Sequence, residues 1–344
     1  MSRHFLITGG AGFIGSNYAA RLLHRNERVT ILDNLSRRGA EKNIQWLRQR
    51  YGEGSFILNT NDIRDAEAVE QAVFDVDAIV HLAGQVAVTT SVQNPRDDFE
   101  INALGTFNVL EAARKSSKKP MFIYASTNKV YGGMEDVRVI EEETRYSYQD
   151  FPLGISESRP LDFHSPYGCS KGCGDQYVRD YYRIYGLPTV VLRQSCIYGP
   201  RQFGIEDQGW IAWFIIAALS GKQISIYGDG KQVRDVLFID DLLNVYDLVF
   251  DHIDSCAGEI FNIGGGIANS MSVWKEFAPR LEALTGREIP VTRGDWRPGD
   301  QKIYISDIRK AQSLLNWSPK VDVDSGIRKL FDWAKENMDL FIGG

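Results

Sequence analysis

The sequence has few features of secreted, membrane or nucleic-acid-binding proteins. Only four of its 344 residues are cysteines, too few for a disulfide scaffold, so we expect reduced thiols. Cys169 and Cys173 are four residues apart, but no second Cys or His pair has a matching spacing, and we expect no metal site. The formal net charge is −6, which argues against the basic field that non-specific nucleic-acid binding requires.

Long hydrophobic runs are also missing. The longest apolar run lies around 211–219 and is far shorter than the roughly 18 residues that a membrane span requires. The chain begins MSRHFLITGG, which already reads as part of a folded strand. We therefore expect no membrane contact, no signal peptide and a cytoplasmic location.

What the sequence does contain is an alternation of short apolar runs and helix-length segments. The apolar runs lie at 5–8, 29–33, 56–58, 78–83, 121–125 and 189–193. Helical patterns occupy 12–26, 65–75, 96–117 and a long segment that starts near Tyr167. This alternation predicts an α/β fold, a Rossmann-type doubly wound parallel sheet with helices on both faces.

The alternation of strands and helices becomes less regular after residue 194, where the sequence is richer in glycine, tryptophan and turn residues. We expect residues 1–194, together with about 236–255, to form a dinucleotide-binding domain. Residues of about 195–235 and 256–344 are expected to form a smaller C-terminal domain that binds the substrate.

A glycine-rich loop follows the first strand at once. Gly9, Gly12 and Gly15 allow a tight turn, a close approach of the backbone to a pyrophosphate and close packing of the next helix on the sheet. Asp33 ends the second strand, where a carboxylate accepts both ribose hydroxyls and repels a 2′-phosphate, so NAD is favoured over NADP. The alternative is a glycine turn and a strand-end aspartate with no ligand.

A tyrosine and a lysine are spaced for one face of a helix. Tyr167 and Lys171 form a Y-x-x-x-K pair, and an ammonium beside a phenol favours the phenolate that a base at neutral pH requires. Thr127 ends the fifth strand, where its hydroxyl is available to a reacting oxygen. Taken alone, the pair is also compatible with an ordinary exposed helix face.

Seven motifs together resemble the extended short-chain dehydrogenase/reductase superfamily of nucleotide-sugar epimerases and dehydratases. They are TGGAGFIG at 8–15, HLAGQ at 81–85, STNKVYG at 126–132, SPYGCSK at 165–171, R-x-x-x-IYGPRQ at 193–202, VRDVLFIDD at 233–241 and NIGGG at 262–266. The resemblance covers almost the whole chain. It implies that Thr127, Tyr167 and Lys171 are catalytic.

The resemblance also implies which residues bind NAD and a nucleotide sugar. The implied NAD contacts are Gly9, Gly12, Phe13, Ile14, Gly15, Asp33, Asn34, Asp62, Ile63, Leu82, Ala83, Gly84, Asn102, Tyr167 and Lys171. The implied substrate contacts are Gln85, Thr127, Asn128, Gln202, Arg234 and Arg297. A homodimer through the helix at 96–117 and the helix near Tyr167 is implied as well.

The two residues after Thr127 bear on which reaction the protein catalyses. Dehydratases of this superfamily resemble one another in having Thr-Asp-Glu there, an acid and a base for removing water, whereas this sequence has Asn128 and Lys129. Dehydration is therefore disfavoured, and oxidation followed by re-reduction, which needs no such pair, is favoured.

Longer stretches around the site resemble the 2-epimerase branch of the superfamily, which acts on CDP-linked 3,6-dideoxyhexoses. They are GQVAVTTSVQNPRDDFEIN at 84–102, LDFHSPYGCSKG at 161–172, RQFGIEDQGW at 201–210 and GKQVRDVLFIDD at 230–241. The resemblance implies inversion at C2 through a 2-keto intermediate and a place in O-antigen sugar synthesis. A UDP-sugar 4-epimerase, a 4,6-dehydratase and a non-enzymatic dinucleotide sensor remain as alternatives.

Overall fold

A computed structural model describes residues 2–297 and 300–341, and the chain divides into two compact units. Unit 1 consists of Met1–Val130, Ser165–Arg193 and Leu243–Phe261, and unit 2 of Tyr131–His164, Gln194–Leu242 and Asn262–Gly344. Within the described ranges, no helix is both long and apolar enough to cross a membrane.

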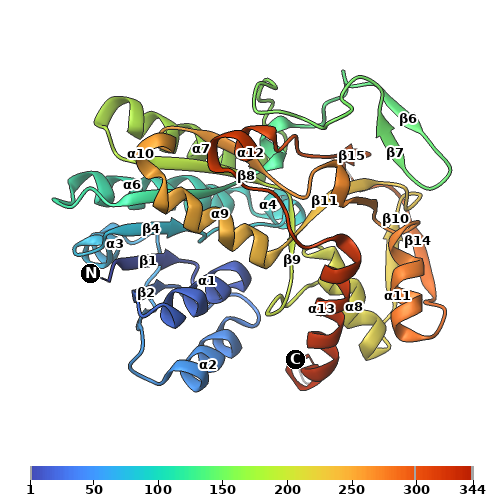
Figure 1. Ribbon diagram of the computed structural model, residues 1–344, viewed down its shortest axis with the longest axis horizontal. Helices are drawn as coiled ribbons and strands as arrows, with labels where there is room; N and C mark the ends of the chain where they lie inside the picture. The colour runs from blue at the N-terminus through green and yellow to red at the C-terminus, as the bar shows by residue number, and fades with distance from the viewer. Residues whose placement is uncertain (1, 298–299, 342–344) are drawn as a thin grey trace. The chain divides into compact units, whose positions relative to one another are not determined.

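The core of unit 1 is a seven-stranded sheet with the order β12-β8-β5-β4-β1-β2-β3 (Figure 1). Its strands are β1 (His4–Thr8), β2 (Arg28–Leu32), β3 (Ile57–Asn59), β4 (Ala78–His81), β5 (Met121–Thr127), β8 (Thr189–Gln194) and β12 (Ile260–Ile263). β1 pairs in parallel with both β2 and β4, so Thr8 has Leu32 on one side and His81 on the other. The predicted doubly wound α/β fold is confirmed.

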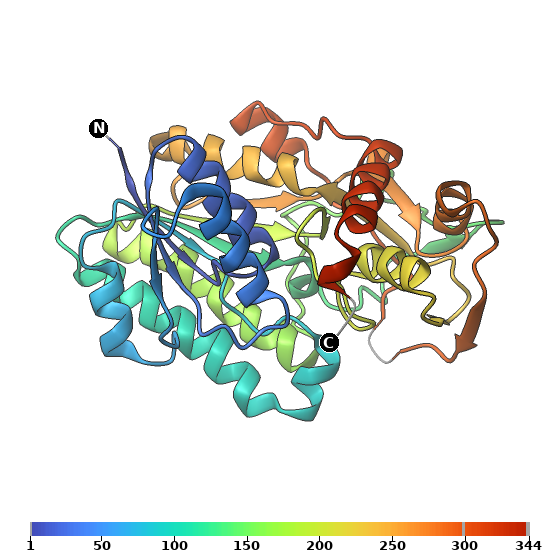
Figure 2. The ribbon, with the colours of Figure 1, turned by 90° about the horizontal axis from the view of Figure 1, so that it is seen from below.

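Helices cover both faces of this sheet. They are α1 (Phe13–His24), α2 (Ala40–Tyr51), α3 (Ala66–Val73), α4 (Val88–Gln93), α5 (Pro95–Phe99), the π-helical turn η1 (Glu100–Leu104), α6 (Gly105–Lys115), α7 (Ser165–Tyr185), α9 (Ile239–Asp251) and α10 (Ile253–Cys256). α1 and α2 lie on one side of the sheet and α6 and α7 on the other, as Figures 1 and 2 both show. Buried apolar residues such as Val69, Leu110, Phe122 and Val178 join α3, α6 and α7 to the strands. This packing places α7 against β5.

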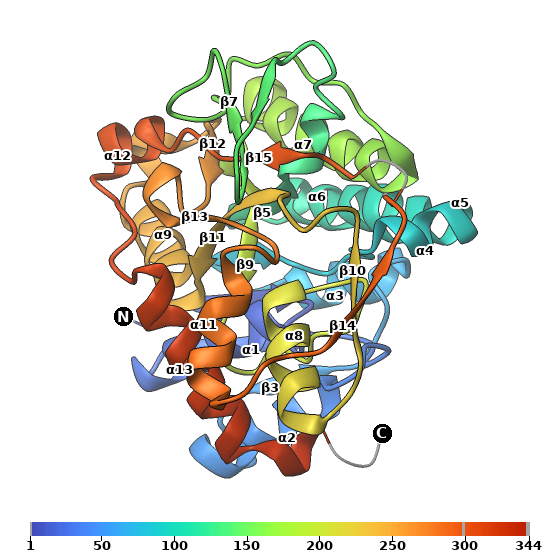
Figure 3. The ribbon, with the colours of Figure 1, turned by 90° about the vertical axis from the view of Figure 1, so that its right-hand side faces the viewer.

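Unit 2 is built around β11 (Val233–Phe238), which pairs with β9 (Cys196–Tyr198), β13 (Ser270–Ser272) and β15 (Ile303–Tyr304). Two further strand pairs are β10 (Ile224–Tyr227) with β14 (Val291–Gly294), and β6 (Val139–Glu141) with β7 (Tyr146–Tyr148). Its longer helices are α8 (Trp210–Ser220), α11 (Phe277–Thr285), α12 (Arg309–Leu315) and α13 (Val323–Glu336). In Figure 3, α8 lies beside α11 and α13.

The unit boundaries differ from those expected from the sequence. Residues 131–164, expected in the first domain, group with unit 2, because Tyr146 packs on Val233 and Ile303, and Ile155 hydrogen-bonds to Ile305. The strand expected near 237 to join the large sheet is β11 of unit 2, and β12 instead completes the large sheet. β12 suits that position because all four of its residues are buried.

Candidate active site

The candidate cofactor loop lies where the sheet order reverses direction. β1 has β2 on one side and β4 on the other, and ligands of open α/β sheets bind at such a switch point. Gly9 has φ +68° and lies so close to the loop after β4 that an added Cβ would be 2.6 Å from the backbone nitrogen of Ala83. A Cβ on Gly15 would be 2.5 Å from the carbonyl oxygen of Gly9. Only glycine fits at these two positions.

Gly12 differs from its neighbours because its Cβ position is largely open. A Cβ there would meet only the Gly9 carbonyl oxygen, at 3.2 Å. Gly12 caps α1 and has no side chain with which to accept a hydrogen bond from the first turn. The N-terminus of α1 therefore offers backbone N–H donors and a positive dipole end to an anion.

Asp33 follows β2 and is fixed by the backbone on both sides. Its Oδ2 accepts a hydrogen bond from the Ala11 nitrogen and its Oδ1 accepts one from the Leu35 nitrogen, both at 2.9 Å. Burial raises the pKa of the carboxyl, and the two backbone donors oppose that effect. Asn34 donates to Asp62 Oδ2 at 2.8 Å. The structure thus brings three of the expected cofactor residues to one edge of the sheet.

Thr127, Tyr167 and Lys171 come together in unit 1, where all three are buried. Thr127 ends β5, while Tyr167 and Lys171 lie in the first two turns of α7. Thr127 is hydrogen-bonded to Tyr167 and also accepts the Lys129 backbone nitrogen at 3.2 Å. Burial raises the pKa of the phenol, and the hydrogen bond with Thr127 partly offsets the effect. Burial is thus the largest influence on the pKa of Tyr167. The spacing of Tyr167 and Lys171 in the sequence could not reveal this influence.

Lys171 is buried against an aromatic ring. Its ammonium lies 4.3 Å from the centroid of the Tyr124 ring, a cation–π contact. Burial lowers the pKa of Lys171 to about 8, against the opposing charges of Asp175 and Asp98. Sequence reasoning missed Tyr124 and Asp98, although Asp98 lies within the 84–102 stretch that resembles the 2-epimerases.

The loop after β4 contains the expected residues Leu82, Ala83, Gly84 and Gln85. Asn102 fixes this loop by hydrogen bonds to its backbone. Asn102 Oδ1 accepts the Gln85 nitrogen at 2.9 Å, and its Nδ2 donates to the Gln85 carbonyl oxygen at 3.0 Å. Asn102 lies in the π-helical turn η1, a wide turn that often occurs at functional sites.

His81, the last residue of β4, is fixed as a neutral imidazole. Its ring nitrogens hydrogen-bond to Thr8 at 2.6 Å and Thr106 at 2.9 Å, and burial lowers its pKa to about 3. The ring stacks on Tyr124 at a centroid distance of 5.7 Å. His81 therefore supports the aromatic ring beneath Lys171.

The remaining expected substrate residues lie in unit 2, and both arginines have acidic neighbours there. Arg234 of β11 pairs with Asp300 at 2.6 Å. Arg297 pairs with Asp207 at 3.0 Å, and its guanidinium lies 3.9 Å from the centroid of the Tyr227 ring. Gln202, the third, donates from Nε2 to the Ile197 carbonyl oxygen at 3.2 Å.

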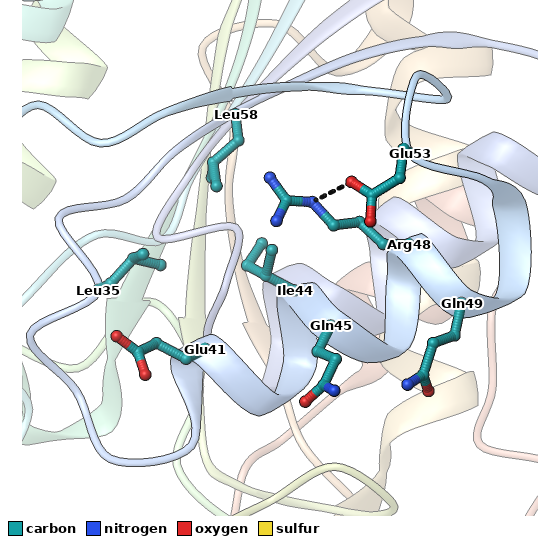
Figure 4. A pocket seen from close by; sticks show the side chains of 8 residues that line it. All are labelled: Leu35, Glu41, Ile44, Gln45, Arg48, Gln49, Glu53 and Leu58. Carbon is teal, nitrogen blue, oxygen red and sulfur yellow. Dashed lines mark ion pairs between the residues drawn. The ribbon is translucent and has the colours of Figure 1, made fainter.

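Unit 1 also contains a hollow of about 520 Å³ between α2, Leu35 and Leu58 of β3 (Figure 4). It is lined by Leu35, Glu41, Ile44, Gln45, Arg48, Gln49, Glu53 and Leu58. Arg48 and Glu53 form an ion pair at 3.2 Å on its rim. None of the expected catalytic or cofactor residues lines it, so the hollow is not the candidate active site.

Comparison with known proteins identifies the family. A family model described as GDP-mannose 4,6 dehydratase matches residues 6–330. The chain is 46% identical over 336 residues to a CDP-paratose 2-epimerase from Salmonella typhi, covering 96% of this chain and 98% of the relative. The chain belongs to the extended short-chain dehydrogenase/reductase family of nucleotide-sugar epimerases and dehydratases.

Other members of this family have different reaction names. A putative UDP-glucose 4-epimerase from Methanocaldococcus jannaschii is 35% identical, covering 96% of this chain and 98% of its own. The crystal structure of a UDP-glucuronic acid 4-epimerase from Bacillus cereus, in complex with UDP-glucuronic acid and NAD, superposes with a TM-score of 0.80 at 29% identity. The superposition covers 97% of this chain and 99% of that one. Members of the family are enzymes that act on nucleotide sugars.

Proposed function

We propose that this protein is an NAD-dependent epimerase that inverts C2 of a CDP-linked 3,6-dideoxyhexose, interconverting CDP-paratose and CDP-tyvelose. The observation that carries the proposal is the 46% identity to a CDP-paratose 2-epimerase, which extends over nearly the full length of both chains.

The residues of unit 1 fit NAD. The open Cβ position of Gly12 and the uncapped N-terminus of α1 suit a pyrophosphate. The carboxylate of Asp33, fixed by two backbone donors, suits the adenosine ribose hydroxyls. NAD, when bound, would supply a positively charged ring that accepts two electrons together with one proton from the sugar carbon and returns them. NAD is therefore the expected cofactor.

In the proposed mechanism, Tyr167 is the acid and base. As a phenolate it takes the proton from the C2 hydroxyl, and it later returns a proton to the C2 oxygen. Thr127, which is hydrogen-bonded to Tyr167, holds the same oxygen. The ammonium of Lys171 stabilises the phenolate and binds a ribose hydroxyl. Burial raises the pKa of Tyr167, and the hydrogen bond with Thr127 and the charge of Arg37 oppose that effect.

The polar groups after β5 favour epimerisation over dehydration. Removing water from the sugar requires a proton donor and a carboxylate base, whereas Asn128 and Lys129 occupy the two positions after Thr127. Asn128 accepts a hydrogen bond from the Thr127 hydroxyl at 3.3 Å, so it serves to orient that hydroxyl. Neither residue replaces a carboxylic acid.

Arg234 and Arg297 of unit 2 are the proposed ligands of the substrate diphosphate. A guanidinium matches phosphate geometry, and each arginine is oriented by an ion pair with an aspartate. The exposed aromatic side chains Phe107 of α6 and Tyr177 and Tyr185 of α7 suit a homodimer contact, which sedimentation velocity tests directly. A purely monomeric sedimentation profile would contradict the dimer.

The reaction is tested with a panel of nucleotide sugars and proton NMR of the products. We expect the purified protein to convert CDP-paratose to CDP-tyvelose without added reductant and to leave UDP-glucose and dTDP-glucose unchanged. Formation of UDP-galactose would instead support a 4-epimerase, and a 4-keto-6-deoxy product would support a dehydratase. A variant with Arg234→Met should raise KM for CDP-paratose much more than it lowers kcat.

A further inference from the structure

A buried carboxylate lies behind the candidate catalytic lysine. Asp98 of α5 is 1% exposed and forms no ion pair within the part of the chain that the structure describes. Its Oδ2 accepts the Ser170 hydroxyl at 2.5 Å, and its Oδ1 accepts the Asn102 amide at 3.1 Å. Burying an ionised carboxylate with only two neutral donors is costly. A carboxylate buried at this cost is expected to serve a function in the site.

The two partners of Asp98 connect it to both sides of the site. Ser170 directly precedes Lys171 on α7, and its hydroxyl also accepts the Asn102 amide at 3.1 Å. Asn102 holds the loop after β4 through both the N–H and the carbonyl of Gln85. A Cβ added to Gly84 of that loop would be 2.9 Å from Asn102 Oδ1 and 3.9 Å from Lys171 Nζ. One carboxylate thus anchors the lysine helix and the cofactor loop together.

The charges that face Lys171 come from several elements. Asp175, one turn along α7, also raises the pKa of Lys171, but Asp175 already forms a buried ion pair with Arg193 at 2.9 Å and accepts a hydrogen bond from Ser126 at 2.6 Å.

The described neighbours of Lys171 on the strands carry no charge that could balance the ammonium. Tyr124 presents its neutral ring and His81 is an uncharged imidazole. Tyr167 lies on the same helix, and burial raises the pKa of its phenol. Of the two carboxylates near Lys171, Asp98 is the one without an ion pair of its own among the described residues; burial raises its pKa, and the Ser170 hydroxyl and the Lys171 charge oppose that effect.

We propose that Asp98 is a positioning residue of the active site, which fixes Lys171 and Asn102 through Ser170 and supplies the counter-charge for the buried lysine ammonium. The proposal rests on the role given to Lys171 in the proposed function. Without Asp98, the ammonium would lose its proton at lower pH, because an opposite charge nearby favours the charged form. Asp98, together with Asp175, thereby raises the pH at which Lys171 loses its proton.

The test measures the titration of Lys171 directly in the protein without substrate. The protein is prepared with ¹⁵N-labelled lysine side chains, and Lys171→Met identifies the Lys171 signal. Asp98→Asn, which keeps the shape of the side chain, should lower the titration midpoint by about one pH unit. The alkaline limb of the kcat profile should move in the same direction, with little change in KM. Asp97→Asn is the matched control, because the adjacent Asp97 is exposed and pairs with Arg64 at 2.9 Å.

A reciprocal measurement keeps the test decisive if Asp98→Asn does not fold. In Lys171→Met, the carboxyl of Asp98 should titrate at higher pH than in the unmodified protein, as followed by ¹³C NMR, because its cation is gone. Unchanged midpoints for Lys171 in Asp98→Asn, or for Asp98 in Lys171→Met, would overturn the proposal. Both measurements need no sugar, so a wrong choice of substrate would appear separately, as inactivity of the unmodified protein.

Discussion

Replacing Tyr167 with phenylalanine removes the proposed acid and base while keeping the ring. The side chain is 8% exposed, so the phenylalanine ring keeps the packing and loses only the hydroxyl and its hydrogen bond with Thr127. Loss of one such bond costs about 1 kcal/mol of the free energy of unfolding. Loss of a positioned acid and base lowers kcat by about 10²–10⁴-fold. That range is equivalent to about 3–5 kcal/mol of activation free energy.

The assay compares initial rates of CDP-paratose conversion by NMR with thermal unfolding by circular dichroism. Tyr181→Phe is the matched control, since it lies on the same helix and loses a hydroxyl that donates to Glu111 at 2.7 Å, outside the site. We expect Tyr181→Phe to retain normal turnover and Tyr167→Phe to lose it. A Tyr167→Phe protein with kcat within about threefold of the unmodified value, where the loss expected from general catalysis is far larger, would refute the assignment.

Three further outcomes are expected. Because the pKa of Lys171 is about 8 and only its protonated form stabilises a phenolate, kcat should fall as the pH rises through about 8; a flat profile from pH 7 to 10 would contradict this. Gly15→Ala should abolish NAD binding in calorimetry, since its Cβ would overlap the loop backbone, whereas Gly54→Ala, with nothing within 4 Å, should bind NAD normally. Arg193→Met leaves the buried Asp175 unpaired and should lower the free energy of unfolding by about 3–5 kcal/mol in urea titrations; a loss below about 1 kcal/mol would contradict that role.

The sequence was most informative about the first half of the fold. Strands of β-branched and aliphatic residues separated by amphipathic helices predicted the parallel sheet, and the strand before Gly9 and the strand that ends near Asp33 lie as expected. The second half was harder, because β11 contains Arg234 and Asp235 although all of its residues are buried. Its polar residues are satisfied by long-range contacts, such as Ser306 donating to Asp235, that no local pattern reveals.

In the candidate site, too, some residues could be predicted from the sequence and others could not. The spacing of Tyr167 and Lys171 placed both side chains on one helix face, and Thr127 at a strand end placed its hydroxyl beside them. The supporting residues Tyr124 and Asp98 come from separate elements that only tertiary packing brings to Lys171. The pKa directions also depend on burial, which a motif does not specify.

The fate of the C2 proton tests the proposed oxidation and re-reduction at C2 most directly. CDP-paratose is incubated with the purified enzyme in D₂O, with no NAD added, and the product is examined by proton NMR. We expect CDP-tyvelose that retains its proton at C2, because that hydrogen leaves and returns without exchanging with solvent. Deuterium at C2 would mean that the carbon is deprotonated and reprotonated, and it would contradict the roles proposed for Thr127, Tyr167 and Lys171.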